Sequence, residues 1–268
     1  MMNLTVLCDN NARVGSYYLA EPGVSYYIEC DEKKILFDTG FSDVFLRNAR
    51  ALGIDLTALD AIALSHGHDD HTGGLPYLPA TENKIPLYAC PGIFDPKREE
   101  GKVDGSPLTL SQAQERFALH LSAEPAAITE HLWHLGEIPR VTDFECRRPF
   151  GEKFVDGKWE EDYMLDDSAL VYVGEDGLTI ITGCSHSGIC NIVEQAKKVF
   201  HEERIAGVIG GLHMPKMTPK VGRTVEYLKA QNVKRLCPCH CTGFYARAAI
   251  HAAAPIEEIC VADTPEFE

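Results

Sequence analysis

Residues 65–74 contain four side chains that can bind a metal within six consecutive positions. These side chains are His66, His68, Asp70 and His71, in the pattern HxHxDH, and the glycines among and after them let the backbone turn sharply. Imidazole and carboxylate ligands together suit zinc, iron or manganese, depending on geometry and availability. A solvent-exposed polar turn seldom combines four ligands at these offsets, so the stretch predicts a metal site.

Two further histidines occur in a similar local setting. The apolar run at 60–64 predicts a buried strand, so the cluster follows a strand end, where loops carry chemistry on a rigid scaffold. His186 and His240 also lie beside glycine-containing loops just after expected apolar strands, and we expect them to complete the ligand set. The remaining histidines examined lack this setting and are interpreted as ordinary residues: His120, His131, His134, His201 and His251.

The pattern of apolar residues predicts strands and helices that position these loops. Strands are expected at 1–9, 24–30, 34–38, 61–64, 85–90, 169–173, 178–182, 205–209, 234–237 and 258–261. Helices are expected at 42–53, 111–119 (with a capping box from Ser111 to Gln114), 189–200, 222–230 and 243–254. The chain 1–268 is interpreted as one domain.

The segment 92–162 breaks this pattern repeatedly with glycine and proline, although a hairpin is expected to turn at Asp156-Gly157. Long irregular segments are usually either disordered or functional. Because this one follows the metal loop, we interpret it as a lid and substrate-binding insertion.

Composition limits the classes of partner. The net charge of −15 argues against a nucleic-acid groove, and an acidic surface fits a small-molecule substrate. No run is long and apolar enough for a membrane span, and the start of the chain lacks the pattern of a signal peptide. We therefore expect a cytoplasmic location, with the ten cysteines as free thiols.

The metal cluster resembles the signature of the metallo-β-lactamase-fold metallohydrolases, and more narrowly the chain is similar to the 7,8-dihydropterin-6-yl-methyl-4-(β-D-ribofuranosyl)aminobenzene 5′-phosphate synthase family. The matching stretches are 36–40 (LFDTG), 66–74 (HGHDDHTGG), 136–140 (GEIPR), 183–188 (GCSHSG), 210–213 (GGLH) and 240–243 (HCTG). The resemblance implies an α/β fold, a four-layer αββα sandwich, with the insertion as a lid. It also implies that the first two histidines hold one metal and that Asp70 and His71 hold a second, with zinc favoured and iron or manganese as alternatives.

One position departs from the superfamily pattern. Many members carry an acidic bridging ligand after the hairpin at 169–182, where this chain has Cys184. A thiolate can bind a soft or borderline metal, and a buried packing thiol is an equal alternative. The number of metals, one or two, depends on this position.

Four other positions receive expected roles. Asp38 is expected to orient a metal-binding histidine through its ring N–H. His213 is expected to contact substrate or transfer a proton, and with Asp70 it forms the expected catalytic pair. Arg140 is expected to bind a substrate anion, among the basic residues of the insertion: Lys97, Arg98, Arg140, Arg147 and Arg148. In an extended segment the thiols of residues 237, 239 and 241 would share one face, leaving His240 on the other.

The sequence thus favours a metal-dependent hydrolase-type enzyme, since a bound metal lowers the pKa of water from about 16 to about 7. If the narrower resemblance holds, the reaction is instead a pterin-related condensation with loss of diphosphate. A non-catalytic metal or ligand sensor is the alternative from another class. A di-iron oxidase of this fold is disfavoured because such enzymes usually have Glu where His68 stands.

Overall fold

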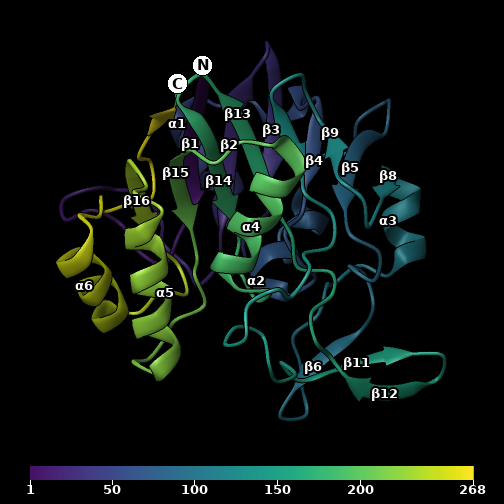
Figure 1. Cartoon of the computed structure of the whole chain (residues 1–268). Helices are drawn as coiled ribbons and strands as arrows, with labels where there is room; N and C mark the ends of the chain where they lie inside the picture. Colours follow the sequence, from purple (N-terminus) through teal and green to yellow (C-terminus); the bar gives the residue numbers. More distant parts are fainter. Residues whose placement is uncertain (268) are drawn as a thin grey trace.

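Two large β-sheets form the centre of the computed structural model, which describes residues 1–267 (Figure 1). The first sheet has the order β17 (Glu266–Phe267), β1 (Met2–Cys8), β2 (Ser25–Cys30), β3 (Lys33–Phe37), β4 (Ala61–Ala63), β5 (Ile85–Ala89) and β8 (Phe117–Leu121). The second has the order β16 (Arg235–Pro238), β15 (Ile205–Gly210), β14 (Gly177–Thr182), β13 (Ala169–Gly174), β10 (Leu132–His134) and β9 (Ala126–Ala127).

The two sheets have a similar arrangement of strands. Each contains an antiparallel hairpin, β2–β3 or β13–β14, whose second strand begins a parallel run: β3, β4, β5 and β8 in the first sheet, and β14, β15 and β16 in the second. Parallel strands need crossovers, and helices supply most of them. The helices are α1 (Val44–Leu52), α2 (Asp69–Thr72), α3 (Leu110–Arg116), α4 (Ile189–Phe200), α5 (Pro219–Ala230) and α6 (Phe244–Ala253).

Three apolar clusters define the layers. The central cluster joins side chains from the facing sides of both sheets, such as Ile28 and Phe37 from the first and Leu170 and Ile209 from the second. A second cluster packs α1 and α3 on the outer side of the first sheet, and a third packs α4, α5 and α6 on the outer side of the second. The expected αββα sandwich is therefore confirmed. Because both faces of each sheet are covered, the inner strands β4, β14 and β15 are buried along their whole length and consist mostly of apolar residues.

The segment 92–162 does not form one separate unit. Its strand β8 extends the first sheet, and β9 and β10 extend the second. Only a small four-stranded sheet lies apart: β12 (Lys158–Glu161), β11 (Glu152–Val155), β6 (Lys97–Glu99) and β7 (Lys102–Val103). Figure 1 shows it projecting below the two large sheets, and its β11–β12 hairpin turns at Asp156-Gly157 as expected.

Two expected elements differ from the structure. The helix expected at 111–119 ends at Arg116, because Phe117–Leu121 pairs in parallel with β5, and its capping box joins Thr109 to Gln112. Residues 258–261 do not form a strand. Their apolar side chains are buried, but the segment runs beside β1 irregularly, and the last strand is instead β17, which pairs with β1. No helix within residues 1–267 is both long and apolar enough to cross a membrane.

Candidate metal centre

The expected ligands lie together at one edge of the sandwich. The loops after β4, β14 and β16 leave the carboxyl ends of parallel strands, and in Figure 1 this edge lies low in the molecule, near α2. Ligands commonly bind beyond the carboxyl ends of parallel strands. A cavity of about 410 Å³ opens here, lined by His68, Asp70, His186 and His240 among others, and His66 and His71 are buried next to these residues.

The first group of ligands consists of three histidines. The ring centroids of His66, His68 and His186 are 4.7–4.8 Å apart in every pairing. Burial lowers the pKa of His68 to about 4 and the pKa values of His66 and His186 well below the ordinary value, so all three rings are neutral. Among the described residues, Nε2 of His66 and both ring nitrogens of His186 are buried without a hydrogen-bond partner. Buried polar atoms are seldom left unpaired, so this group fits a metal ion.

The second group combines Asp70, His71 and His240. One carboxylate oxygen of Asp70 lies 3.5 Å from Nε2 of His71, and the other lies 3.4 Å from Nε2 of His240. Burial disfavours charge at Asp70, but His71 and His240 outweigh this effect and lower its pKa well below the ordinary value. Burial likewise opposes the charged form of His71, but Asp70 and Asp38 raise its pKa to about 9. The ring thus has a proton that a metal would replace, and the donor set fits a divalent ion.

Asp38 supports both groups, as expected from the sequence for a residue after β3. Its Oδ2 accepts a hydrogen bond from Nδ1 of His71 at 2.7 Å and another from the hydroxyl of Ser65 at 2.6 Å. Because that hydroxyl has a single proton, its oxygen accepts from Nδ1 of His66 at 2.9 Å. One carboxylate therefore leaves Nε2 of both histidines free to bind a metal. Gly183 is required beside it, since a Cβ there would lie 2.1 Å from Oγ of Ser65.

His240 is oriented by the end of β1, which the sequence analysis did not identify. Its Nδ1 donates to the side-chain oxygen of Asn10 at 2.8 Å, and its backbone N–H donates to Asp9 at 3.0 Å. The residues are about 230 positions apart. No local pattern around Asn10 indicates this contact, because only the packing of the two sheets brings it about.

Cys184 lies between the two ligand groups. Its Sγ is 3.3 Å from Nε2 of His71 and 3.2 Å from Nε2 of His240, and it also lies close enough to His66 and His186 to share a metal with them. Burial, with Cys241 beside it, raises the pKa of its thiol well above the ordinary value. This position is suited to a bridging ligand.

Cys241 differs from the expectation that it packs with Cys237 and Cys239 on one face. Those two are buried in the central cluster, whereas Cys241 lines the metal cavity and its Sγ accepts a hydrogen bond from the backbone N–H of His213. The alternation fails because His240 has a φ of 49°, which ends the extended run. Burial opposes ionisation of this thiol, but Cys184 and His240 lower its pKa to about 7.

The HxHxDH loop is held in place by the small sheet. The backbone N–H of Gly67 donates to Asp166 at 2.9 Å, and the ammonium of Lys97 on β6 contacts Asp162 at 2.6 Å and Asp166 at 3.0 Å. Lys97 is therefore a buried structural cation and is unavailable to a substrate anion. A Cβ at position 67 would lie 2.4 Å from the carbonyl oxygen of Ile93, so only glycine fits there.

His213 lies at the cavity wall, as expected, and Arg140 does not. The ring of His213 is 4.3 Å from that of His186 and 5.1 Å from that of Phe150, and burial lowers its pKa to about 4. The guanidinium of Arg140 instead donates to the carbonyl oxygens of Ile138, Tyr163 and Met164. Arg140 is absent from the lining of the metal cavity and connects two loops.

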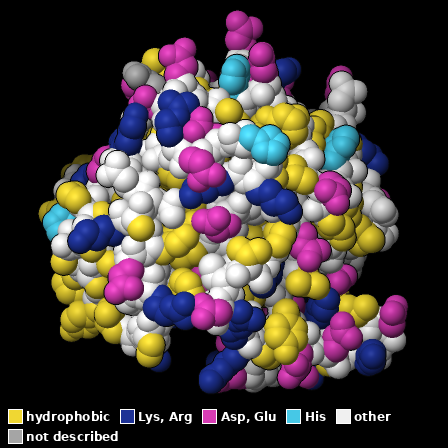
Figure 2. Space-filling model, in the orientation of Figure 1, with side chains coloured by type: hydrophobic (Ala, Val, Ile, Leu, Met, Phe, Trp, Pro, Cys, Tyr) yellow, Lys and Arg dark blue, Asp and Glu magenta, His cyan; other side chains and the backbone are white. Residues whose placement is uncertain are grey.

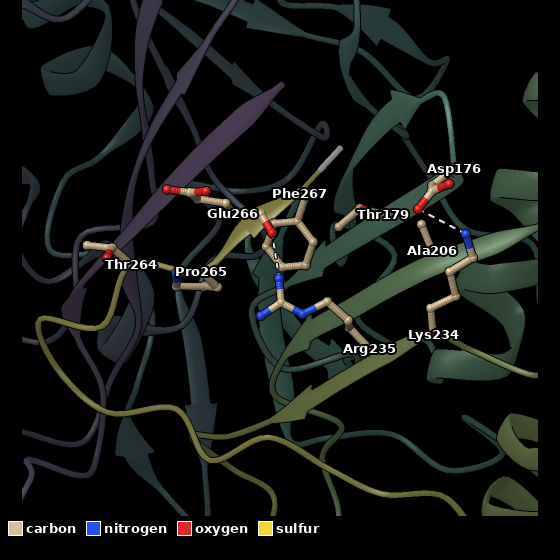
Figure 3. Close-up of a pocket in the computed structure, with 9 residues that line it drawn as sticks. All are labelled: Asp176, Thr179, Ala206, Lys234, Arg235, Thr264, Pro265, Glu266 and Phe267. Atoms are coloured by element: carbon tan, nitrogen blue, oxygen red, sulfur yellow. Dashed lines mark hydrogen bonds and ion pairs between the residues drawn. The ribbon is translucent and has the colours of Figure 1, made fainter.

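Another cavity, of about 530 Å³, lies at the opposite end of β14, β15 and β16 and is shown in Figure 3. Its two basic side chains already have partners: Lys234 contacts Asp176 at 2.9 Å, and Arg235 donates to the carbonyl oxygen of Glu266. The Arg235 guanidinium also lies over the ring of Phe267. Among residues 1–267, the groups of candidate metal ligands all lie at the other edge.

Comparisons with known proteins bear on the family of the chain. The model of the metallo-beta-lactamase superfamily matches residues 19–200. The chain is 33% identical over 261 residues to the 7,8-dihydropterin-6-methyl-4-(beta-D-ribofuranosyl)-aminobenzene-5′-phosphate synthase of Methanocaldococcus jannaschii, covering 91% of this chain and 89% of the relative. It is 34% identical over 248 residues to an uncharacterized protein of the same archaeon, covering 91% of each. The crystal structure of Tm1679, a metal-dependent hydrolase of the beta-lactamase superfamily, superposes with a TM-score of 0.87 at 30% identity, covering 100% of this chain and 99% of that one. The chain therefore belongs to the metallo-β-lactamase superfamily.

Proposed function

We propose that the protein is an enzyme of hydrolase type that uses two divalent transition metals, zinc first, on a small phosphate-bearing or ester-like substrate. One observation supports this above the others: six ligands from distant parts of the chain meet in two groups, with unpartnered ring nitrogens, around a single cavity. Bound divalent metals at such sites polarise a phosphoryl or carbonyl oxygen and make a water nucleophile available at neutral pH.

Three residues of the chain are assigned roles in the reaction in addition to metal binding. Asp70 is partly open to the cavity, so its carboxylate can orient the nucleophile as well as bind a metal. His213 is neutral near pH 7, and a ring nitrogen can accept a proton or a hydrogen bond from the substrate. Phe150, whose ring packs against those of His186 and His213, limits access of bulk water.

The small sheet is proposed as a lid and substrate-binding element. Glu99 of β6, Asp104 after β7 and Phe150 before β11 all line the metal cavity. The sheet, with the residues that flank it, thus forms part of the wall of this cavity. Changes in its position would alter access to the metals directly.

A second candidate reaction is a pterin-related condensation with loss of diphosphate. The 33% identity to the synthase extends over 91% of the chain and favours this reaction specifically. Metals held by the same two ligand groups would then bind the diphosphate leaving group, and the nucleophile would come from the aminobenzene substrate. Hydrolysis and condensation thus differ in the nucleophile and share the metal centre.

The test combines metal analysis of the purified protein with a substrate panel of phosphodiesters, lactones, thioesters and pterin diphosphates. We expect close to two metals per chain and turnover of at least one class, with turnover and at least half of the metal lost in His68→Ala. Condensation is indicated if a pterin diphosphate is consumed only when an aminobenzene ribose phosphate is present. Tight metal binding without turnover of any class would favour a sensor and refute the enzyme proposal.

A further inference from the structure

A second cavity lies directly beside the metal cavity. It measures about 560 Å³ and shares two wall residues, Phe150 and His213, with the metal cavity. Their rings pack edge to face at 5.1 Å, so together they form a partition between the two spaces. A ligand that passes this partition would occupy both cavities at once.

The two cavities carry opposite charge. The metal cavity is lined by the carboxylates of Asp69, Asp70, Glu99 and Asp104 and by no lysine or arginine. The second cavity is lined by Arg147, Arg148, Lys216 and Lys220 and by no acidic residue. We call this second cavity the basic cavity. In a chain of net charge −15, four cations and no carboxylate at one cavity point to an anionic ligand.

Three of these cations are available to a ligand, whereas the guanidinium of Arg147 already donates to the carbonyl oxygen of Thr142 at 2.7 Å. Among residues 1–267, none of the four forms an ion pair with a carboxylate within 4.0 Å, whereas arginines elsewhere, such as Arg13, Arg204 and Arg235, are paired. Lys220 is half-buried beside the partition, and its positive potential adds to the effect of burial in lowering the pKa of His213. Figure 2 shows basic side chains gathered at the lower edge of the molecule, between α5 and the β11–β12 hairpin.

The fold adds two further features that suit a phosphate group. Helix α5 begins at Pro219 after Thr218, so the positive end of its dipole lies at the basic cavity. The rest of the lining is largely apolar, with Phe144, Phe150 and Met214 available to contact a sugar or aromatic ring. Guanidinium and ammonium groups match the charge and oxygen geometry of a phosphate monoester.

We propose that the basic cavity binds the phosphate monoester end of a substrate whose other end reacts in the metal cavity. The assignment of the reacting end rests on the function proposed above, but phosphate binding by the basic cavity does not require turnover. Specificity for phosphate is thereby assigned to Lys220 and Arg148 rather than to Arg140, whose guanidinium is bonded to backbone carbonyls.

The experiment measures binding of ribose 5-phosphate to the zinc-loaded protein by isothermal titration calorimetry, with ribose as the uncharged counterpart. Lys220→Gln and Arg148→Gln should each weaken ribose 5-phosphate about tenfold to a hundredfold, because each removes a charge-assisted hydrogen bond. Lys220→Arg should retain most of the affinity. The matched control is Lys229→Gln, which makes the same charge change on an exposed position of α5 outside both cavities and should bind like wild type.

A His68→Ala variant separates this proposal from the proposed function. Because His68 does not line the basic cavity, this metal-depleted variant should still bind ribose 5-phosphate within about threefold of wild type. Three results would overturn the proposal: binding equal to wild type in Lys220→Gln and Arg148→Gln, binding that disappears in His68→Ala, or no binding to wild type at millimolar concentration. If no substrate is turned over but ribose 5-phosphate still binds and Lys220→Gln weakens that binding, only the proposed enzymatic function is refuted.

Discussion

Lys97 connects the HxHxDH loop to the small sheet. It lies far along the sequence from every candidate metal ligand. Its ammonium is buried with the carboxylates of Asp162 and Asp166, and these side chains are 1–3% exposed. Burial alone would lower the pKa of Lys97, but the two carboxylates outweigh it and raise the pKa above the ordinary value. Lys97 is therefore charged at neutral pH, and Asp166 also accepts a hydrogen bond from the backbone N–H of Gly67.

Replacing Lys97 by methionine keeps the apolar stem and removes the charge. Two buried carboxylates then remain close together without a cation, and breaking a buried ion pair in this way costs about 3–5 kcal/mol. At about 2–4 °C of melting temperature per kcal/mol, the expected loss is about 6–20 °C. The metal loop loses its anchor at Gly67, so we expect metal affinity to fall about tenfold to a hundredfold as well, as it does when groups supporting metal ligands are removed.

The assay is urea unfolding followed by circular dichroism, together with zinc titration of the folded protein. Lys102→Met is the matched control, because Lys102 is an exposed lysine of the same small sheet with no ion pair among the described residues. The triple variant Lys97→Met, Asp162→Asn, Asp166→Asn should recover part of the lost stability, because it removes the uncompensated charge. A Lys97→Met protein within about 1 kcal/mol of wild type, with unchanged zinc affinity, would refute this reasoning.

Four further predictions concern the ligands and their neighbours. His68→Ala should lose at least half of the bound metal, measured by elemental analysis, while His120→Ala, which changes a histidine outside every ligand group, keeps it. Cys184→Ser should weaken the absorption from thiolate to metal in the cobalt-substituted protein; an unchanged spectrum and stoichiometry would leave Cys184 as a packing residue. Asp38→Asn should lower metal affinity about tenfold to a hundredfold in competition with a chelator, because the ring of His71 loses its charged acceptor, and a smaller change would count against this role. Arg140→Ala should lower the free energy of unfolding by about 1–3 kcal/mol and alter the KM of charged and neutral substrates equally; a selective effect on charged substrates would show that it binds the anion.

The features that could be predicted from the sequence are those that depend on residues close together in the chain. The HxHxDH cluster is visible because its candidate ligands lie within six consecutive positions, and His186 and His240 could be proposed because each follows a recognisable apolar strand. The strands and helices of the sandwich follow from the spacing of apolar residues. At 117–121 the same apolar spacing fits helix or strand, and pairing with β5 decides the outcome.

Features that depend on contacts between distant segments could not be predicted in this way. Lys97 appeared to be one of several basic residues of an acidic chain, and its two carboxylate partners are 65 and 69 positions away. Asn10 orients His240 from the other end of the chain. Arg140 was expected to bind an anion because of its charge, but in the fold backbone carbonyls from a loop more than 20 residues away occupy its guanidinium.

The candidate metal centre contains residues from both halves of the sandwich. Its geometry therefore depends on how the two sheets pack against each other. The first sheet supplies the HxHxDH loop with Asp38 beneath it, and the second supplies Cys184, His186 and His240. Two of the three groups of candidate ligands join residues from both halves, whereas the group His66, His68 and Asp70 lies in the first half alone. Gly183 lies where the halves meet, with no space for a side chain between it and Ser65. We therefore expect metal affinity to depend on the apolar cluster between the sheets as well as on the candidate ligands, because that cluster fixes the distance between the two sets of loops.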